Sequence, residues 1–168
     1  SITFGAPSKT FNIAGIVSSY AIVPDDGLRE RFYSWIEANE MGAAPLFSHI
    51  ATIAAFRKGA DWRRQMLSYV EGNIEYVISF CKERIPQIRP LRPQASFLIW
   101  MDCRSLNLDH DSLINLFVEQ AGLALNDGEM FSPGGEGHMR LNVGTSRSLL
   151  KSALTRLETA VKAIPPKP

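Results

Sequence analysis

Apolar side chains recur every three or four positions through much of this chain, which predicts amphipathic helices. Three helices are expected in the first half, over residues 25–39, 46–57 and 61–84. Acidic residues mark two of the starts: Asp25 precedes the first helix, and Asp61 is the expected N-cap of the longest. Glycine and proline mark the break at residues 41–45. A helix as long as the third is suited to joining two lobes.

Shorter apolar stretches alternate with small and polar residues over positions 1–24. The pattern, with apolar stretches Ile2–Phe4, Ile13–Val17 and Tyr20–Val23, predicts two short buried strands that flank a loop, and Pro24 closes this part. We expect such apolar strands to cause self-association or disorder if nothing covers them.

In the second half of the chain, strands and helices alternate. The clearest strand is residues 95–102, where Phe97, Ile99 and Met101 lie on one face and Leu98 and Trp100 on the other. We expect Trp100, Phe97 and Tyr76 to be core aromatics. Further strands are expected over residues 123–125 and 138–143, with an edge strand or lobe boundary at the proline-rich residues 85–93.

Two more helices complete this half. Asp111 is the expected N-cap of one, and Ser146 or Ser148 starts the last, which Pro165 and Pro166 end. The alternation predicts an α/β fold class for this lobe, with helices on one face of a short sheet.

Composition and charge narrow the class of protein. Of 168 residues, 45% are hydrophobic and 21% charged, the balance of a globular domain that can bury a core. Eighteen basic residues against 17 acidic ones give a net charge of +1, which disfavours nucleic acid and anionic membrane as partners. No apolar run reaches the roughly 18–20 residues of a membrane span.

The cysteines and histidines predict no metal centre. Cys81 and Cys103 are too few and too far apart for a disulfide framework or a zinc site, and they fit a reduced, cytoplasmic compartment as idle thiols. The histidines, His49, His110 and His138, are isolated from one another and from cysteine.

One lysine stands out in the loop APSKTFNIAG, residues 6–15, because it lies among small and apolar residues between Pro7 and Gly15. Apolar surroundings lower the pKa of a lysine by disfavouring its charged form, and a neutral amine can form a Schiff base. Spacing alone equally allows Lys9 to be an ordinary surface lysine, and allows Ser8 to be a turn former.

The residues Ser8-Lys9-Thr10-Phe11-Asn12-Ile13-Ala14-Gly15 resemble the cofactor-lysine motif of pyridoxal-phosphate enzymes of the class I/II aminotransferase superfamily, in particular its cystathionine β-lyase or C–S lyase branch. Four further blocks match the same branch in the same order: residues 51–56, Trp62 with 69–73, residues 96–102, and 124–128 with 135–142. Single blocks are weak signals, but five in order are specific.

The resemblance implies a fold and indicates which part of the enzyme this chain represents. It implies that the chain is the C-terminal part of a fold-type I pyridoxal-phosphate enzyme, with the cofactor-pairing Asp and most of the phosphate-binding loop lying upstream. Residues 1–45 would be a remnant of the large cofactor-binding domain, 46–84 connecting helices, and 85–168 a small C-terminal α/β domain. It also implies a homodimer with the active site at its interface, so we expect the chain alone to be inactive.

The resemblance also implies roles for particular residues. Lys9 would hold pyridoxal 5'-phosphate and then move the substrate's Cα proton, Ser8 would contact the cofactor, and Arg140 would grip the α-carboxylate, a task suited to a bidentate guanidinium. Taken alone, Arg140 would more often be a surface charge at a strand edge. Arg147 matches a basic position of the branch but receives no role.

The chain departs from the branch at several positions. A phosphate-binding hydroxyl and an arginine of many relatives correspond to Ala6 and Val17 here. His138 replaces a bulky apolar residue, and we expect its ring to face solvent. The glycine-rich residues 134–137 are expected to form a mobile loop that delivers Arg140.

The implied reaction is β-elimination from an S-substituted cysteine such as cystathionine, giving a thiol, pyruvate and ammonia. An aminotransferase using the same lysine and arginine is the alternative, and nothing in these residues separates the two. A non-catalytic structural or dimerisation fragment is the third reading of the chain.

Overall fold

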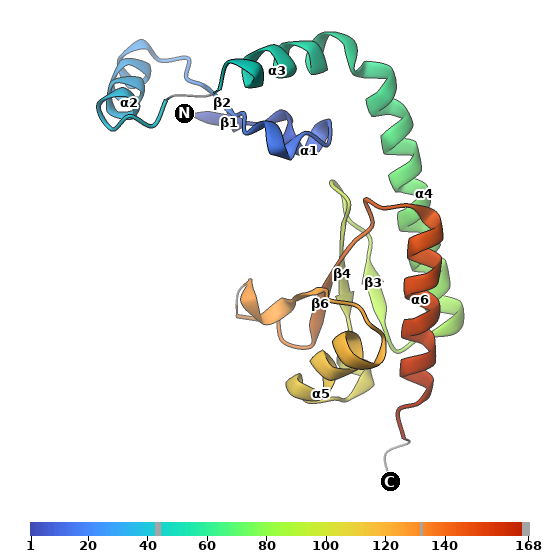
Figure 1. Cartoon of the computed structure of the whole chain (residues 1–168). Helices are drawn as coiled ribbons and strands as arrows, with labels where there is room; N and C mark the ends of the chain where they lie inside the picture. The colour runs from blue at the N-terminus through green and yellow to red at the C-terminus, as the bar shows by residue number, and fades with distance from the viewer. Residues whose placement is uncertain (43–44, 132, 166–168) are drawn as a thin grey trace. The chain divides into compact units, whose positions relative to one another are not determined.

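The computed structural model describes residues 1–42, 45–131 and 133–165 of the chain. It divides into two compact units, Ser1–Met66 and Leu67–Pro168, and each is described by itself. Figure 1 shows the order of the elements along the chain. The division expected from the sequence, with boundaries after residues 45 and 84, stays a prediction.

The first unit begins with an antiparallel pair of strands, β1 (Thr3–Gly5) and β2 (Tyr20–Ile22). Between them lie the one-turn helix α1 (Pro7–Thr10) and the 3-10 turn η1 (Ala14–Ile16). The two predicted strands are confirmed, but the prediction that they are buried is wrong. Phe4 is 67% exposed and Ile22 55%, although the Phe32 ring meets that of Phe4 edge to face with centroids 5.8 Å apart.

Helices make up the rest of the first unit. They are α2 (Asp26–Ala38), α3 (Leu46–Lys58) and the start of α4 (Ala60–Arg84), which continues into the second unit. Asp25, expected as part of the acidic start of this helix, is its N-cap, and its carboxylate accepts from the backbone N of Leu28 at 2.7 Å. The N-cap prediction for Asp61 is wrong: this residue lies inside the first turn of α4. Residues 43 and 44 of the predicted break lie outside the described residues.

The second unit contains a four-stranded antiparallel sheet in the order β3-β4-β6-β5. Its strands are β3 (Arg89–Leu91), β4 (Leu98–Asp102), β5 (Asn126–Asp127) and β6 (His138–Asn142). β3 lies at an edge, as its prolines predict, and β4 and β6 lie where periodicity places them. The strand predicted at 123–125 is wrong, since the pairing segment begins one residue later.

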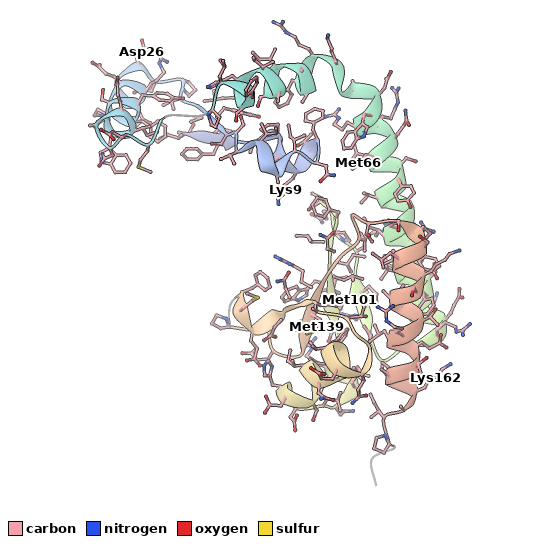
Figure 2. All side chains as sticks on the ribbon, viewed as in Figure 1. Lys9, Asp26, Met66, Met101, Met139 and Lys162 are labelled. Carbon is pink, nitrogen blue, oxygen red and sulfur yellow. The ribbon has the colours of Figure 1, made fainter. Side chains whose placement is uncertain are left out.

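The two faces of this sheet differ in burial. On β4, Ile99 and Met101 are fully buried, whereas Leu98 and Trp100 are half-buried. Met101 lies directly opposite Met139 of β6, which is also fully buried (Figure 2). The predicted alternation is confirmed, and the half-buried face is the one that carries Trp100 and Arg140.

The helices of the second unit begin at polar caps. α5 (His110–Asn115) continues as a π-helical turn, η3 (Leu116–Gln120), and its N-cap is Asp109, whose carboxylate accepts from the backbone N of Ser112 at 2.8 Å. The prediction of Asp111 as N-cap is therefore wrong by two residues. α6 (Arg147–Lys162) is capped by Ser146, as predicted, and ends before Pro165. Pro166 lies outside the described residues.

The helices α4 and α6 lie side by side and run in the same direction (Figure 1). Asn73 of α4 bonds to Arg147 at the start of α6, and Arg84 at the end of α4 bonds to Glu158 near the end of α6. Asn73 and Arg84 are as many residues apart on α4 as Arg147 and Glu158 are on α6. The two helices therefore rise by the same distance between the two contacts.

The two units differ in the size of their cores. The buried apolar side chains of the second unit come from its sheet and helices, including Val77, Ile99, Phe117, Leu154 and Leu157. Among the described residues of the first unit, Phe11 and Val23 are the large apolar side chains in the buried class. Separately, no helix within the described ranges is long and apolar enough to cross a membrane.

Candidate active site

Lys9 lies in the one-turn helix α1, which begins at Pro7. The proline ring fixes φ at a value that suits the first position of a helix. Its side chain is exposed and projects from α1 (Figure 2). No described residue makes a hydrogen bond or ion pair with its Nζ atom. The prediction of a dry turn around Lys9 is wrong for this chain, because the described residues leave the amine in solvent.

The segment after Lys9 is held against α3 by three contacts. The Ser48 hydroxyl donates to the carbonyl oxygen of Ile16, and the Thr52 hydroxyl donates to Ser18 Oγ at 2.8 Å. The rings of Phe11 and Phe56 meet edge to face with centroids 5.3 Å apart. Asn12 and Val17 take up positive φ angles of 53° and 51°, so the segment makes two sharp turns before β2. These contacts fix the course of the chain after Lys9 without covering it.

Ser8 precedes Lys9 in the same helical turn and is half-buried. Ala6, which stands where many relatives place a hydroxyl, is the N-cap of α1 and supplies no side-chain bond. Val17 is 71% exposed and likewise offers no polar group. The Ser8 hydroxyl and the Lys9 amine are polar groups of this loop whose chemistry suits an aldehyde-bearing phosphate ester, and the Thr10 hydroxyl and Asn12 amide lie in the same loop.

Arg140 lies on β6, where the strand pairing fixes its position between Trp100 of β4 and Asn126 of β5. The strand therefore delivers Arg140, and the expectation that the glycine-rich loop does so is wrong. Nη2 donates to Asn126 Oδ1 at 2.8 Å, and the guanidinium carbon lies 4.3 Å from the centroid of the Phe131 ring. The Nε atom is buried and has no hydrogen-bond partner in the described part of the chain.

An unpaired buried N–H is costly, since the lost hydration of such a donor is worth about 1–3 kcal/mol. An entering acceptor such as a carboxylate would restore that bond. The orphaned Nε is thus an observation in this chain that fits the role which the sequence resemblance gives to Arg140. Lys9 and Arg140 belong to different units. The contacts described above for each residue lie within its own unit.

His138 lies beside Arg140 on the same strand and is only 7% exposed, so the expectation that its ring faces solvent is wrong. The ring stacks on Trp100 with centroids 5.4 Å apart and planes 19° apart, and its Nδ1 faces the carbonyl oxygen of Glu136 at 2.9 Å. Trp100 in turn meets Phe131 edge to face at 5.7 Å. Trp100, Phe97 and Tyr76 are half-buried, so the prediction that they are core aromatics is wrong.

Arg147, which received no role from the sequence, contacts α4. Its Nε donates to Asn73 Oδ1 at 2.7 Å, and its guanidinium carbon lies 4.8 Å from the centre of the Tyr76 ring. Through these contacts, Arg147 links the start of α6 to α4. No local sequence pattern predicts that Asn126 and Phe131 contact Arg140, because that contact depends on the β5–β6 pairing.

The remaining candidate groups stand apart from this chemistry. Burial raises the pKa of Cys81 to about 12, and burial followed by the charge of Asp102 raises the pKa of Cys103 to about 12, which suits the idle thiols expected. His110 lies between two carboxylates, with Nδ1 3.0 Å from Glu129 Oε1 and Nε2 3.5 Å from Asp127 Oδ2. Each ring nitrogen therefore faces a different carboxylate.

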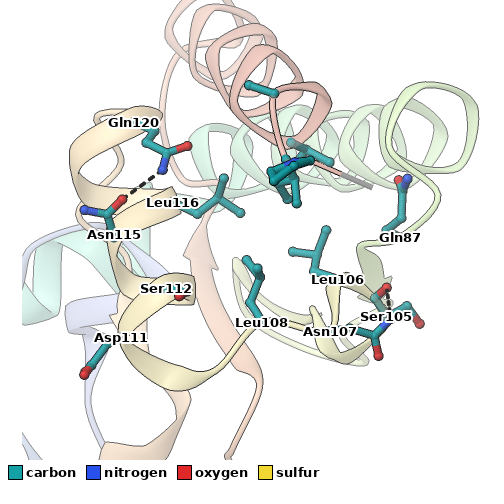
Figure 3. Close-up of a pocket in the computed structure, with 14 residues that line it drawn as sticks. Gln87, Ser105, Leu106, Asn107, Leu108, Asp111, Ser112, Asn115, Leu116 and Gln120 are labelled. Atoms are coloured by element: carbon teal, nitrogen blue, oxygen red, sulfur yellow. Dashed lines mark hydrogen bonds between the residues drawn. The ribbon is translucent and has the colours of Figure 1, made fainter. Parts of the chain in front are cut away.

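A groove of about 930 Å³ lies in the second unit near the ends of α5 and α6 (Figure 3). Its apolar wall includes Leu106, Leu108, Leu116 and Val161. Gln120, on its rim, donates to Asn115 Oδ1 at 2.8 Å. Neither Lys9 nor Arg140 lines it, so the groove lies apart from the candidate active site.

No family model matches the chain. Curated relatives do: the chain is 36% identical over 161 residues to cystathionine beta-lyase PatB of Bacillus subtilis, covering 96% of this chain and 42% of that protein. It is 30% identical over 158 residues to protein MalY of Escherichia coli, covering 94% of this chain and 40% of that protein. The chain spans about two fifths of the length of these relatives.

Solved structures agree. A pyridoxal-phosphate-bound putative aminotransferase from Clostridium difficile matches with a TM-score of 0.91 at 35% identity, covering 95% of this chain and 41% of that one. Cystalysin from Treponema denticola, which contains a pyridoxal 5'-phosphate cofactor, also matches with a TM-score of 0.91, at 30% identity over 96% of this chain and 41% of that one.

These matches define the class of protein: the chain has the fold of the pyridoxal-phosphate-dependent class I aminotransferases, of which it represents the C-terminal part. Within that class it belongs to the C–S lyase branch that includes PatB and MalY. The resemblance expected from the five sequence blocks is confirmed. The roles of Lys9, Ser8 and Arg140 stay predictions.

Proposed function

We propose that this chain is the C-terminal part of a pyridoxal-phosphate-dependent C–S β-lyase that acts on S-substituted cysteines such as cystathionine. The observation that carries the proposal is 36% identity, over nearly the whole chain, to a curated cystathionine β-lyase. The buried, unpaired Nε of Arg140 supports it from the structure. A cytoplasmic location, expected from two free and buried thiols, is part of the same proposal.

In this proposal Lys9 and Ser8 hold the cofactor. The exposed Nζ of Lys9, which has no partner among the described residues, is free to reach an aldehyde, and the Ser8 hydroxyl lies one residue away in the same helical turn. When bound, pyridoxal phosphate supplies an electron sink for the carbanion chemistry. Because Ala6 and Val17 lack polar groups, the remaining phosphate contacts would come from the upstream part of the enzyme.

Lys9 would next act as a base. Its Nζ must be unprotonated to accept the Cα proton. The upstream part of the enzyme would cover the amine, which the described residues leave exposed. The Cβ–S bond would break with its electron pair leaving on sulfur, and the departing thiolate would take up a proton. Hydrolysis of the remaining three-carbon unit would give pyruvate and ammonia.

Arg140 would orient the substrate. A carboxylate bound to the guanidinium fixes one substituent of Cα, so the Cα–H bond is held in one direction relative to the base. The Phe131 ring and the Asn126 amide already restrict the guanidinium before any ligand arrives. Less rotational freedom is then lost on binding.

We also propose that the enzyme is a homodimer, and the surface of α3 supports this part of the proposal. The helix is inverted relative to a surface helix: Ser48 is buried, whereas Phe47, Ile50 and Ile53 are between 52% and 77% exposed. Leu46 extends the same apolar stripe at 70% exposure. A contiguous exposed apolar patch of this kind is typical of an interface.

The lyase is tested against an aminotransferase with the full-length polypeptide that carries this chain. The second candidate is favoured by the match to a putative aminotransferase at 35% identity. Cystathionine with pyridoxal phosphate and no 2-oxo acid should release pyruvate stoichiometrically with the thiol if the enzyme is a lyase. Product formation that depends on an added 2-oxo acid would reject the lyase in favour of the transferase.

The third possibility, an inert fragment, is tested on the 168-residue chain itself. The chain is incubated with pyridoxal phosphate and reduced with borohydride, and the intact mass is measured beside that of Lys9→Ala. We expect no stoichiometric adduct on Lys9 in the fragment, because a Schiff base at an exposed amine is only transient when the upstream part of the enzyme does not hold the cofactor. An adduct absent from Lys9→Ala would show that the fragment binds the cofactor alone.

A further inference from the structure

Two side chains outside the implied catalytic set restrain the guanidinium of Arg140. Asn126, opposite it on β5, accepts from Nη2 at 2.8 Å. The Phe131 ring lies against one face of the guanidinium, 4.3 Å from its carbon atom. One contact fixes the edge of the planar group and the other fixes its plane, so the two together define its orientation.

The ring of Phe131 is itself held in place. Its edge meets Trp100, which stacks on the buried His138, so three rings lie in series along the half-buried face of the sheet. The chain reaches Phe131 through the 3-10 turn η4 (Gly128–Met130), with the Phe131 N–H donating to the Gly128 carbonyl at 3.1 Å.

Two glycines allow the backbone to close beneath this turn. A Cβ on Gly128 would lie 2.2 Å from the carbonyl oxygen of Gly135, and one on Gly135 would lie 2.1 Å from that of Gly128. No side chain fits at either position, since real Cβ contacts are never so short. The close approach ties the turn that carries Phe131 to the segment that leads into β6.

Phe131 is 44% exposed although it is large and apolar, so burial of its own surface does not account fully for its place against Arg140. A ring over a guanidinium gains cation–π attraction without using any of its N–H donors. Nε, which has no hydrogen-bond partner among the described residues, is thereby left for an incoming anion.

We propose that Phe131 and Asn126 are positioning residues that orient the guanidinium of Arg140 for the α-carboxylate of the substrate. This inference rests on the proposed role of Arg140. Phe131 acts through ring contact, which a leucine cannot reproduce and a tyrosine can. Asn126 acts through its side-chain oxygen, which alanine lacks.

The test uses the 168-residue chain labelled with ¹⁵N and follows the Nε–H signal of Arg140, assigned by its loss in Arg140→Lys. Acetate is the carboxylate probe, with chloride at equal ionic strength as the control. In the wild-type chain the guanidinium protons should be shifted upfield by the Phe131 ring current, and acetate should move the Nε–H signal saturably. The variants are Phe131→Leu, Phe131→Tyr and Asn126→Ala, with Leu149→Ala as the matched control at an exposed apolar side chain of α6.

Phe131→Leu should abolish the upfield shift and weaken acetate binding about three- to tenfold, and Asn126→Ala should weaken it by a similar factor. Phe131→Tyr should retain both the shift and the affinity within about twofold, as should Leu149→Ala. Unchanged acetate affinity in Phe131→Leu and Asn126→Ala, or no ring-current shift in the wild type, would overturn the positioning role and leave Arg140 as the anion site. Failure of the wild-type Arg140 signal to respond to acetate would instead contradict the proposed role of Arg140 itself.

Discussion

Arg147 donates from Nε to Oδ1 of Asn73 at 2.7 Å, and Asn73 is fully buried. The amide nitrogen of Asn73 donates to the carbonyl oxygens of Val143 and Thr145 at 2.8 and 2.9 Å. Two of these hydrogen bonds join α4 to the turn between β6 and α6, and the third joins α4 to the start of α6. A buried amide with every partner satisfied stabilises one arrangement of these elements, because any slip would leave several polar groups unpaired.

Replacing Asn73 with leucine should lower the free energy of unfolding by about 2–4 kcal/mol, since two carbonyl groups and Arg147 would lose their partner. Urea denaturation followed by circular dichroism measures the change. Gln65→Leu, an exposed amide on the same helix, is the matched control and should change stability by less than about 0.5 kcal/mol. Equal effects of the two substitutions would show that the network does not fix the α4–α6 contact.

The carboxylate of Glu158 should make stability depend on pH. Hydrogen bonds from Lys162 and then from Arg84 hold its pKa below the usual range. A lowered pKa in the folded state means that the stabilisation is present above about pH 4.3, the usual value for glutamate, and is lost as the pH falls through the folded value. Glu158→Gln should therefore destabilise the chain at neutral pH and have progressively less effect in acid.

The measurement is urea denaturation of Glu158→Gln and of the wild type across the acid range. Glu83→Gln, which changes an exposed carboxylate near the end of α4, should show no such convergence. A difference between wild type and Glu158→Gln that stayed constant down to the lowest pH would contradict the assignment of the lowered pKa to these two hydrogen bonds.

The apolar stripe on α3 should make the 168-residue chain self-associate. Sedimentation velocity should show a concentration-dependent oligomer, and Ile50→Lys with Ile53→Lys should shift it towards monomer because both side chains are more than half exposed. Leu149→Lys, which is similarly exposed on α6, should leave association unchanged. A wild-type chain that is monodisperse and monomeric would contradict the interface.

The contact between Gly128 and Gly135 predicts that a single methyl group is not tolerated there. Gly128→Ala should destabilise the chain by about 1–3 kcal/mol, the usual cost of overpacking, because backbone atoms lie where the Cβ must go. Gly27→Ala is the control, since the nearest atom to its Cβ would be 3.7 Å away in ordinary contact. A thermal melt in which both variants match the wild type would refute the close approach.

The elements with strong periodicity could be predicted from the sequence. The last helix has its apolar residues at helical spacing behind a serine cap, and the structure places α6 behind Ser146 as expected. The strands β4 and β6 likewise follow their alternation. Local chemistry is decisive in these segments, because one buried face and one capping side chain fix both the type of element and its start.

Positions that depend on tertiary contacts could not be predicted. Asp109 and Asp111 are equivalent as caps in sequence, and only the packed structure selects the first. Burial was misjudged in both directions: Lys9 is exposed because little in the described part of its unit covers it, and His138 is buried because Trp100 stacks on it across the strand pair. The partners of Arg140 come from β5 and the turn after it, which no local pattern connects to β6.

The measurement that bears most directly on the central claim locates the amine that binds pyridoxal phosphate. The full-length holoenzyme is reduced with borohydride and digested, and the pyridoxyl-bearing peptide is sequenced by mass spectrometry. The account predicts the modification on Lys9, with none in the Lys9→Ala protein. A pyridoxyl group on any other lysine of this chain, or on a lysine outside it, would contradict the account.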